Sequence, residues 1–305
     1  MDINFEYYKI FYYVAKYGNI TKAATALGSN QPNVTRIMKI LESQLGCTLF
    51  IRQARGVSLT QEGEKLYTHV EAAYRQLMNA QEALSDFADG SSGSVEIGAT
   101  ESALHLYMLD AINGFRDKYP GVRIKINNHT TNQIIRFLID GRIDFAILTM
   151  PAQIPKGYVV EKLTDFDEIL VGGTHYRNLS EKENSMSELS AYPWVGLGRG
   201  TATYDFYREF FLENNMDMEL DMEVATSDLV KPLILKNMGI GYIPQRLAEE
   251  DIKCGRLFEI RTACQVPLRS IALVYDKSRK RSAAAERFYE FLGDSRLKRH
   301  LDRHF

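Results

Sequence analysis

The sequence predicts an α/β multidomain protein: an N-terminal winged helix-turn-helix, a long linker helix and a C-terminal α/β body. Three observations predict this architecture. Short helical patterns separated by glycines fill the first sixty residues, a heptad pattern follows them, and strand and helix patterns alternate beyond a Gly/Ser-rich segment. The 305 residues suffice for two or three domains. A composition of 45% hydrophobic and 25% charged residues excludes low-complexity and fibrous classes.

The helix-turn-helix is predicted from three helical patterns in the first sixty residues. The first spans about 8–17. The second follows Thr21, which we take as its N-cap, and ends at Gly28. The third has Pro32 in its first turn, where the missing N–H is harmless, and ends at Gly46. Two helices joined by a tight glycine turn predict a helix-turn-helix.

The polar face of the third helical pattern carries residue types suited to DNA. Amide and guanidinium groups can pair with base edges in a major groove, whereas hydroxyl and ammonium groups suit phosphate. For an isolated helix, a solvated polar face would be the simpler explanation. Two short extended pieces then flank a turn with Arg52, Arg55 and Gly56, which predicts a β-wing beside that helix.

Together these motifs resemble the LysR-type transcriptional regulators. The matches at fixed spacing are Phe11, Thr21-Lys22-Ala23-Ala24, Gln31-Pro32-Asn33-Val34-Thr35-Arg36, Leu41-Glu42, Leu45-Gly46, Leu49-Phe50-Ile51-Arg52 and Leu59-Thr60-Gln61-Glu62-Gly63. So many matches are more specific than one short motif. Departures such as Cys47, where valine is usual, spare the DNA-facing residues. The resemblance implies a sequence-specific DNA-binding regulator, with residues 1–60 as its DNA-binding domain.

Within this domain we predict a DNA contact for each of nine residues. The predicted contacts with base edges come from Gln31, Pro32, Thr35 and Arg36, with Asn33 on the same helix face. Those with phosphate come mainly from Thr21, Lys39 and Arg52, whereas Arg55 would enter the minor groove.

A heptad seam follows the DNA-binding domain. Apolar residues there alternate at spacings of four and three over about three repeats. The seam residues are Leu66, Val70, Ala73, Leu77, Ala80 and Leu84. A face packed on its own domain is the alternative to a seam between two chains. The resemblance implies a linker helix at 61–89 that joins protomers into a homodimer, or a homotetramer as a dimer of dimers, on successive half-sites.

The α/β body follows a polar hinge at 90–93. Strand patterns near 95–99, 122–126 and 144–148 alternate with helical patterns at 102–118 and 131–140, which predicts a parallel sheet flanked by helices. The resemblance implies a two-lobed effector-binding domain of periplasmic-binding-protein type over 94–305. Its lobe I would comprise 94–164 and 269–305, and its lobe II 165–268, with crossover strands near 166–172 and 268–275.

Polar residues lie where predicted strands end and helices begin. Ligands of open α/β sheets bind there, because helix N-termini offer free N–H groups. Helix capping alone is the alternative for each Thr or Ser. The positions that match the family's effector-contacting stretches are Thr100, Glu101, Ser102, Thr130, Thr131, Arg199, Thr201, Thr203 and Thr226. Hydroxyls, amides and Arg199 suit a small anionic or polar effector, whereas Glu101 would oppose a carboxylate beside it.

No catalytic or metal-binding constellation stands out in the sequence. The chain contains no Gly-x-Ser-x-Gly, P-loop, His-Glu-x-x-His or Cys-x-x-Cys motif, and its six histidines share no ligand spacing. Three widely spaced cysteines predict neither a disulfide framework nor a zinc site. Trp194 is more simply a packing residue of lobe II than a ligand-stacking one. We therefore expect no catalytic residue, no metal, no cofactor and no enzymatic activity.

Charge is distributed unevenly along the chain. Residues 1–60 hold seven Lys/Arg and three Asp/Glu, a net of +4, whereas residues 61–276 have a net of −11 and residues 277–305 a net of +5. The whole-chain net charge of −2 therefore averages unlike parts. A basic nucleic-acid module on an acidic body and a chance excess both fit these values. The basic C-terminal segment is a solvated turn and helix start or, alternatively, an oligomer or DNA contact.

The complete interpretation is a regulator that binds a dyad-symmetric promoter site in double-stranded DNA. A small molecule in the interlobe cleft would change DNA bending and RNA polymerase recruitment, a mechanism implied by the resemblance. Neither a signal-peptide pattern nor an apolar stretch of eighteen residues is seen, so we expect a cytoplasmic protein without a membrane partner. Two alternatives stay open: an effector-independent repressor with a vestigial cleft, and a solute-binding protein.

Overall fold

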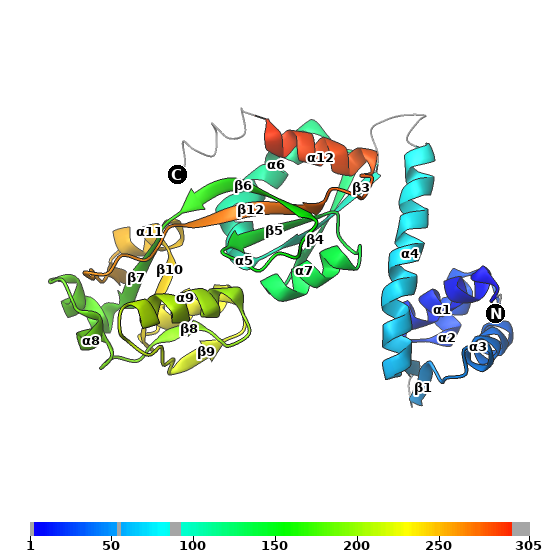
Figure 1. Cartoon of the computed structure of the whole chain (residues 1–305), viewed down its shortest axis with the longest axis horizontal. Coiled ribbons are helices and arrows are strands. Elements are labelled where there is room, and N and C mark those ends of the chain that lie inside the picture. Colours follow the sequence, from blue (N-terminus) through cyan, green and yellow to red (C-terminus); the bar gives the residue numbers. More distant parts are fainter. Residues whose placement is uncertain (1–2, 54–55, 86–92, 295–305) are drawn as a thin grey trace. The chain divides into compact units, whose positions relative to one another are not determined.

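The structure is a computed structural model, and it describes residues 3–53, 56–85 and 93–294 (Figure 1). Its contacts divide the chain into an N-terminal unit of Met1–Ser85 together with Asp140–Arg142, and a C-terminal unit of the remaining residues. None of the helices in these ranges is both long and apolar enough to cross a membrane.

The N-terminal unit contains four helices and a two-stranded antiparallel wing. These elements are α1 (Phe5–Tyr17), α2 (Ile20–Ala26), α3 (Gln31–Leu45), β1 (Phe50–Gln53), β2 (Gly56–Leu59) and α4 (Gln61–Ser85). Asparagines cap the first three helices: the side chains of Asn4, Asn19 and Asn30 accept hydrogen bonds from backbone N–H groups of the first turn. Gly18 and Gly46 end α1 and α3 in the left-handed region, where glycine is favoured.

The predicted N-cap of α2 is wrong. The helix begins at Ile20, and Asn19 is its cap, because the Asn19 side chain accepts a hydrogen bond from the backbone N–H of Lys22 at 3.0 Å. Thr21 lies inside the helix, where its carbonyl oxygen accepts a hydrogen bond from the Thr25 hydroxyl at 3.1 Å. The earlier asparagine takes the role because its side-chain oxygen reaches the N–H three residues on.

The core of the N-terminal unit lies between α1, α2 and α3. Phe11, Val14, Val34 and Leu41 are fully buried in it, together with Ala23, whose small side chain lets the helices approach closely. The carboxylate of Glu42 accepts hydrogen bonds from the backbone N–H groups of Leu49 and Phe50, at 2.8 and 3.2 Å. The wing is therefore fixed to the end of α3.

The first half of α4 packs on α1 through tyrosines. The ring of Tyr12 stacks on those of Tyr67 and Tyr74, with centroids 5.9 and 4.6 Å apart, and the hydroxyls of Tyr13 and Tyr74 lie 3.1 Å apart. Burial, followed by the hydrogen bond with Tyr13, raises the pKa of Tyr74 to about 12, so its hydroxyl stays protonated.

The predicted heptad seam is only partly covered within this chain. Leu66 and Val70 are half-buried against the core of the N-terminal unit, which fits the alternative of packing on the same domain. Ala73 is exposed, and Leu77 is 44% exposed. The side chains of the other two seam residues, Ala80 and Leu84, lie outside the described residues, as does most of the predicted hinge.

Lobe I of the C-terminal unit is built on a five-stranded sheet. In sheet order its strands are β4 (Val122–Asn128), β3 (Gly93–Ala99), β5 (Phe145–Met150), β12 (Arg269–Asp276) and β6 (Tyr158–Phe166). The predicted parallel sheet is correct for β4, β3 and β5 but incomplete, because β12 pairs antiparallel with both β5 and β6. The return strand from lobe II therefore lies inside the sheet, between β5 and β6.

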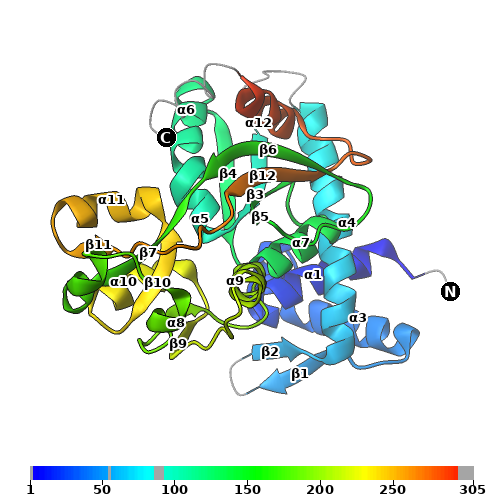
Figure 2. The same ribbon diagram turned by 60° about the vertical axis from the view of Figure 1, so that its left-hand side comes forward.

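Helices pack on this sheet (Figure 2). They are α5 (Glu101–Ala103), the π-helix η1 (Leu104–Met108), α6 (Leu109–Lys118), α7 (Thr131–Ile139) and α12 (Ala283–Gly293). The first three form the helical run predicted at 102–118, with a π-helical segment inside it. In the core, the buried ring of Phe288 contacts those of Phe115 and Phe145, with centroids 5.1 and 5.8 Å apart.

Lobe II contains two small sheets, with the chain passing from β6 into its central strand. The antiparallel sheet has the order β10 (Ile240–Pro244), β7 (Glu168–Gly173), β11 (Leu257–Glu259), and the parallel pair is β8 (Val195–Leu197) with β9 (Met222–Val224). The helices are η2 (Thr174–Ser180), α8 (Met186–Leu189), α9 (Ala202–Glu213), η3 (Ser227–Leu229), α10 (Val230–Leu235) and α11 (Gln245–Lys253). The lobes therefore connect through β6–β7 and through the start of β12.

We predict that Gly63→Ala destabilises the N-terminal unit. A Cβ added there would lie 2.2 Å from the carbonyl oxygen of Leu49, so the backbone of α4 or the wing must shift. The expected cost is about 1–3 kcal/mol, measured in the full chain as faster hydrogen exchange of α1–α3 amides. Gly293→Ala is the control, because its Cβ would meet nothing within 4 Å. Equal protection in the two variants would contradict the prediction.

Candidate functional site

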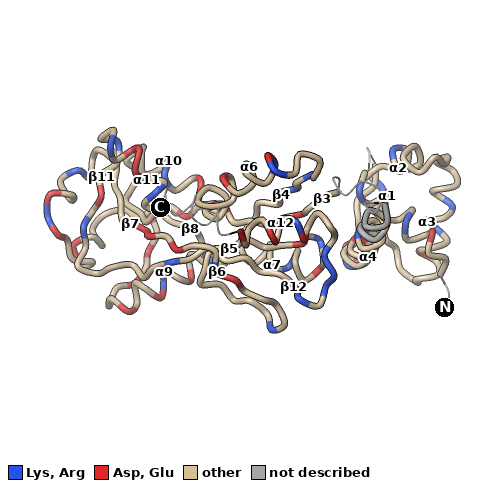
Figure 3. The backbone as a smooth tube through the Cα atoms, turned by 90° about the horizontal axis from the view of Figure 1, so that it is seen from above, with Lys and Arg blue, Asp and Glu red and all other residues tan. Residues whose placement is uncertain are grey.

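The exposed face of α3 presents most of the predicted DNA-contacting residues. Gln31, Pro32, Arg36 and Lys39 are exposed, whereas Val34 on the opposite face is fully buried. This alternation follows from helical periodicity: the apolar stripe faces the core, and the remaining positions face outward. Figure 3 marks the basic residues of α2 and α3 in blue.

Hydrogen bonds within α3 hold several of these side chains in place. The amide of Asn33 donates to the Ser29 hydroxyl at 3.2 Å, and its oxygen accepts from the Arg36 guanidinium at 3.1 Å. The Thr35 hydroxyl donates to the carbonyl oxygen of Gln31 at 2.9 Å. An oriented guanidinium loses less conformational entropy when it forms a bidentate contact with a base. The arrangement suits readout of a major groove.

The remaining predicted DNA contacts lie on α2 and the wing. Thr21 is exposed on α2, and Arg52 is exposed on β1. Arg55 lies outside the described residues.

A cleft between the two lobes brings together eight of the nine predicted effector residues. This cleft, which we call the hydroxyl cleft, has a volume of about 60 Å³. The predicted residues that line it are Thr100, Glu101, Ser102, Thr130, Thr131, Thr201, Thr203 and Thr226. Arg199 is exposed and does not line it. Gly200, with a φ of +86°, separates Arg199 from the start of α9.

Helix capping does not account for every hydroxyl of the cleft. The Thr201 side chain does cap α9, accepting a hydrogen bond from the backbone N–H of Tyr204 at 3.1 Å. The Thr100 hydroxyl instead lies 3.1 Å from that of Thr149, and no side chain caps α5. The Thr130 hydroxyl donates to the Gln133 side chain at 3.1 Å. Capping alone therefore accounts for Thr201 but not for Thr100.

The acidic residue of the cleft is paired. Glu101 Oε1 lies 2.9 Å from Nε2 of His105, one turn along the same helical run. Across the cleft, the side-chain amide of Asn132 donates to the carbonyl oxygen of Gly200 at 3.0 Å and connects the lobes. Among the described residues, no group of three His, Cys, Asp or Glu side chains could hold a metal ion.

A larger cavity, which sequence reasoning missed, adjoins the hydroxyl cleft. This aromatic cavity has a volume of about 330 Å³ and lies mainly in lobe II, between β8, β10, α9 and α10. Trp194, Tyr207, Phe211 and Tyr242 contribute aromatic rings to its wall. The available signal was the aromatic-rich run at 204–211, which the helical pattern alone cannot distinguish from ordinary core. Trp194 packs against Phe211 as predicted, but it also lines this cavity.

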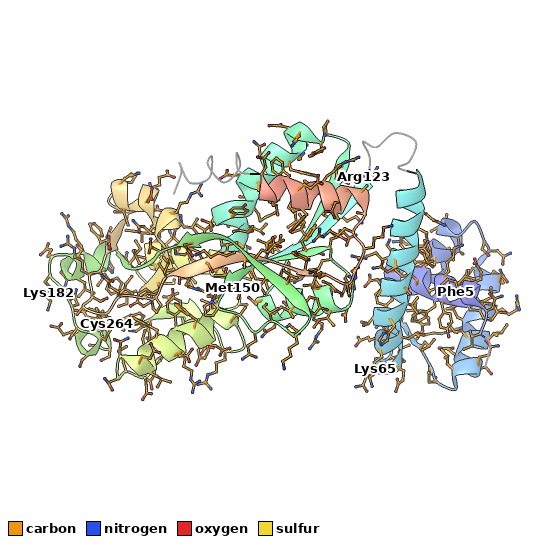
Figure 4. All side chains as sticks on the ribbon, turned by 45° about the horizontal axis from the view of Figure 1, so that its top comes forward. Phe5, Lys65, Arg123, Met150, Lys182 and Cys264 are labelled. Carbon is orange, nitrogen blue, oxygen red and sulfur yellow. The ribbon has the colours of Figure 1, made fainter. Side chains whose placement is uncertain are left out.

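A buried polar network lies where the aromatic cavity meets the crossover strands. The side chains of Arg269 on β12 and Glu168 on β7 are 2% and 5% exposed and form an ion pair at 3.1 Å. Arg269 also donates to the Thr203 hydroxyl at 3.1 Å and to the carbonyl oxygen of Met150, which Figure 4 labels, at 3.3 Å. Partners on three elements therefore satisfy this guanidinium.

Tyr207 completes the network from α9. Its hydroxyl donates to Glu168 at 2.5 Å. Burial, followed by the charge of Glu168, holds the pKa of Tyr207 well above its ordinary value, so the hydroxyl remains a donor. The Arg269 guanidinium also lies 4.6 Å from the ring centroid of Phe206. The network joins both crossover strands to the helix that forms one wall of the cleft.

A winged helix-turn-helix with an exposed polar recognition helix, on the same chain as a two-lobed ligand-binding fold, defines a DNA-binding transcriptional regulator. Residues 5–64 match the model of the bacterial regulatory helix-turn-helix proteins of the lysR family, and residues 88–296 match the LysR substrate binding domain. These matches cover most of the chain. The chain belongs to the LysR family of transcriptional regulators.

Individual relatives are distant but extend over nearly the whole chain. An uncharacterised HTH-type regulator of Escherichia coli (strain K12), YeiE, is 23% identical over 98% of this chain and 100% of its own length. The RuBisCO operon transcriptional regulator of Allochromatium vinosum is 22% identical, with 96% of each chain covered. The structure of full-length CbnR complexed with its target DNA matches with a TM-score of 0.71 at 19% identity, over 95% of this chain and 99% of that one.

We predict that Arg269→Met destabilises the C-terminal unit strongly. The substitution leaves Glu168 buried without its cation, at an expected cost of about 3–5 kcal/mol in chemical denaturation of the full chain. Arg256→Met is the matched control, because Arg256 is 53% exposed and its partner Asp251 keeps an ion pair with Lys231. The control should lose no more than about 1 kcal/mol. The same small loss in both variants would contradict a structural role for the network.

Proposed function

We propose that this LysR-family regulator reads a dyad-symmetric promoter site with α3 and responds to a small-molecule effector held between its lobes. The observation that carries the proposal is the convergence of eight predicted hydroxyl and acidic residues, from both lobes, on one cleft. Polar groups that converge at the carboxyl ends of strands are typical of ligand sites in α/β proteins.

The DNA-binding part of the proposal assigns direct base contacts to α3. Gln31, Pro32, Thr35 and Arg36 would lie near base edges, with Asn33 orienting Arg36. Thr21, Lys39 and Arg52 would contact phosphate, and Arg55 would enter the minor groove.

The proposed assembly is a homodimer through α4, and a homotetramer as a dimer of such dimers. Its support is an open, largely apolar groove of about 310 Å³ on the N-terminal unit, lined by Phe5, Tyr8, Leu66, Val70 and Ala73. The Phe5 side chain is 59% exposed, and a second copy of the chain packed on this groove would bury it. A two-fold axis would present two copies of α3 to successive half-sites.

The proposed regulation depends on contacts between the lobes. In one of these contacts, the Asn132 side chain donates to the Gly200 carbonyl. In another, the Arg246 guanidinium donates to the Leu106 carbonyl at 2.9 Å and to the Asp110 carboxylate at 3.1 Å. An effector that binds one arrangement of the lobes better than another shifts the balance between them. That shift would alter DNA bending and RNA polymerase recruitment. The protein acts in this proposal by binding, without catalysis and without a cofactor.

We expect Arg36→Ala to weaken specific DNA binding by about 1–3 kcal/mol and to relax specificity at one base pair, because a guanidinium pairs bidentately with guanine. A salt-controlled titration against a genomically mapped site measures both effects. Arg116→Ala removes an exposed positive charge from α6 and is the matched control. Unchanged affinity and site preference for the Arg36 variant would refute a base-reading role.

The effector response is tested by a metabolite screen on the full chain. A ligand of the hydroxyl cleft should raise the melting temperature and change the DNA footprint. Thr131→Val should weaken its binding by up to about tenfold, the value of one hydrogen bond, because the buried Thr131 hydroxyl lines the cleft. Thr174→Val, exposed on η2, should not. If metabolites that raise the melting temperature leave the DNA footprint unchanged, the effector-independent repressor is favoured.

A further inference from the structure

We infer that the effector is amphipathic, with a compact hydrogen-bonding head in the hydroxyl cleft and an aromatic body in the aromatic cavity of lobe II. The inference rests on the proposed function, because it concerns the ligand of the proposed cleft. To the proposed function it adds a second subsite and the chemical class of the effector. The polar residues recognised from the sequence indicate neither.

Size separates the two subsites. A cavity of about 150 Å³ accommodates benzene, so the hydroxyl cleft, at about 60 Å³, has room for a head group but not for an aromatic ring. The aromatic cavity, at about 330 Å³, has room for roughly two rings. Ser102, Leu197, Thr203 and Ser227 line both spaces, so one molecule can extend from the cleft into the cavity.

The charged side chains around the aromatic cavity are either paired or exposed to solvent, which favours an uncharged body. Arg269 neutralises Glu168 within the buried network, and the Lys231 ammonium donates to Asp251 at 2.9 Å and to the Leu247 carbonyl. Asp228, at the wall, is exposed to solvent. A charged group placed among Trp194 and its aromatic neighbours would lose its hydration without gaining a partner there. An aromatic body instead gains burial and edge-to-face contacts.

The junction between the subsites offers hydrogen bonds to the head. Among the described residues, the hydroxyls of Ser102 and Ser227 have no hydrogen-bond partner, although both line the cleft and the cavity. Ser102 also lies in the first turn of the helical run from Glu101, whose first N–H groups are free by helix geometry. No Lys or Arg in the described part of the chain lines the cleft. Hydroxyl and N–H donors therefore suit a small acceptor head, a carboxylate or a carboxamide.

The chain carries its own reporter for the body subsite. Trp194 is the single tryptophan of the sequence, and it lines the aromatic cavity while being only 3% exposed. Its indole N–H donates to the Leu189 carbonyl at 3.1 Å, so its position is fixed. A heavy-atom quencher in the cavity would contact the indole, whereas iodide in solution would be kept from it.

The test measures Trp194 fluorescence of the full chain during titration with 4-iodobenzoate and with 4-iodobenzamide. These probes share an aromatic body and differ in the charge of the head. We expect at least one to quench saturably, 2-naphthoate to compete with it, and acetate not to compete. Potassium iodide at equal concentration should quench weakly. The inference would be overturned if, for both aromatic probes, quenching increased linearly with concentration and did not exceed the quenching by potassium iodide.

A pair of variants at one junction position locates the bound probe. Ser227→Phe should weaken probe binding at least tenfold, because its ring would occupy the passage, whereas Ser227→Ala should weaken it only a few-fold. Ser187→Phe, on the exposed face of α8, controls for an added ring. Saturable binding that is equally tight in wild type, Ser227→Phe and Ser227→Ala would overturn the inference. The alanine variant and melting curves identify any folding defect of Ser227→Phe.

The assay contains no DNA, so its outcome is independent of regulation. Saturable quenching together with an unresponsive DNA footprint would retain the two subsites and reject the proposed function. A responsive footprint without aromatic binding would retain the proposed function and reject the amphipathic effector.

Discussion

The C-terminal unit depends on one buried ion pair, that of Arg269 and Glu168. Burying two charges carries a desolvation cost that their attraction offsets only when their other hydrogen-bonding groups are also satisfied. Here Thr203, Tyr207 and the Met150 carbonyl satisfy them. The two charged residues begin the strands on which the chain crosses between lobes, and Thr203 belongs to the cleft wall. The position of that wall therefore follows from the geometry of the crossover.

The N-terminal unit could be predicted largely from the sequence because its determinants are local. A capping asparagine, a first-turn proline and a left-handed glycine each act within one helical turn, so spacing alone locates the helices. The error at Thr21 has the same origin. Asn19 and Thr21 both carry capping side chains two residues apart, and only the backbone conformation, extended at Asn19, decides between them.

The hydroxyl cleft was predictable and the aromatic cavity was not, for a physical reason. Cleft residues such as Thr100 and Thr131 lie at the junctions of strands and helices, and parallel strands bring their carboxyl ends to one edge. The cavity instead requires that Trp194, Phe211 and Tyr242, on separate elements, leave space between their rings. Hydrophobic spacing is the same whether a ring fills the core or borders a void. Arg199 shows the converse, since it carries a suitable charge but is exposed and does not line the cleft.

Division of the effector site into two subsites would separate affinity from response. Contacts of an aromatic body lie almost entirely within lobe II, so they contribute similarly in every arrangement of the lobes and set affinity. Contacts of the head involve Ser102 of lobe I and Ser227 of lobe II, so their strength depends on the distance between the lobes. Only such differential contacts shift a conformational equilibrium. A ligand with the body but not the head would therefore occupy the site without altering the DNA complex.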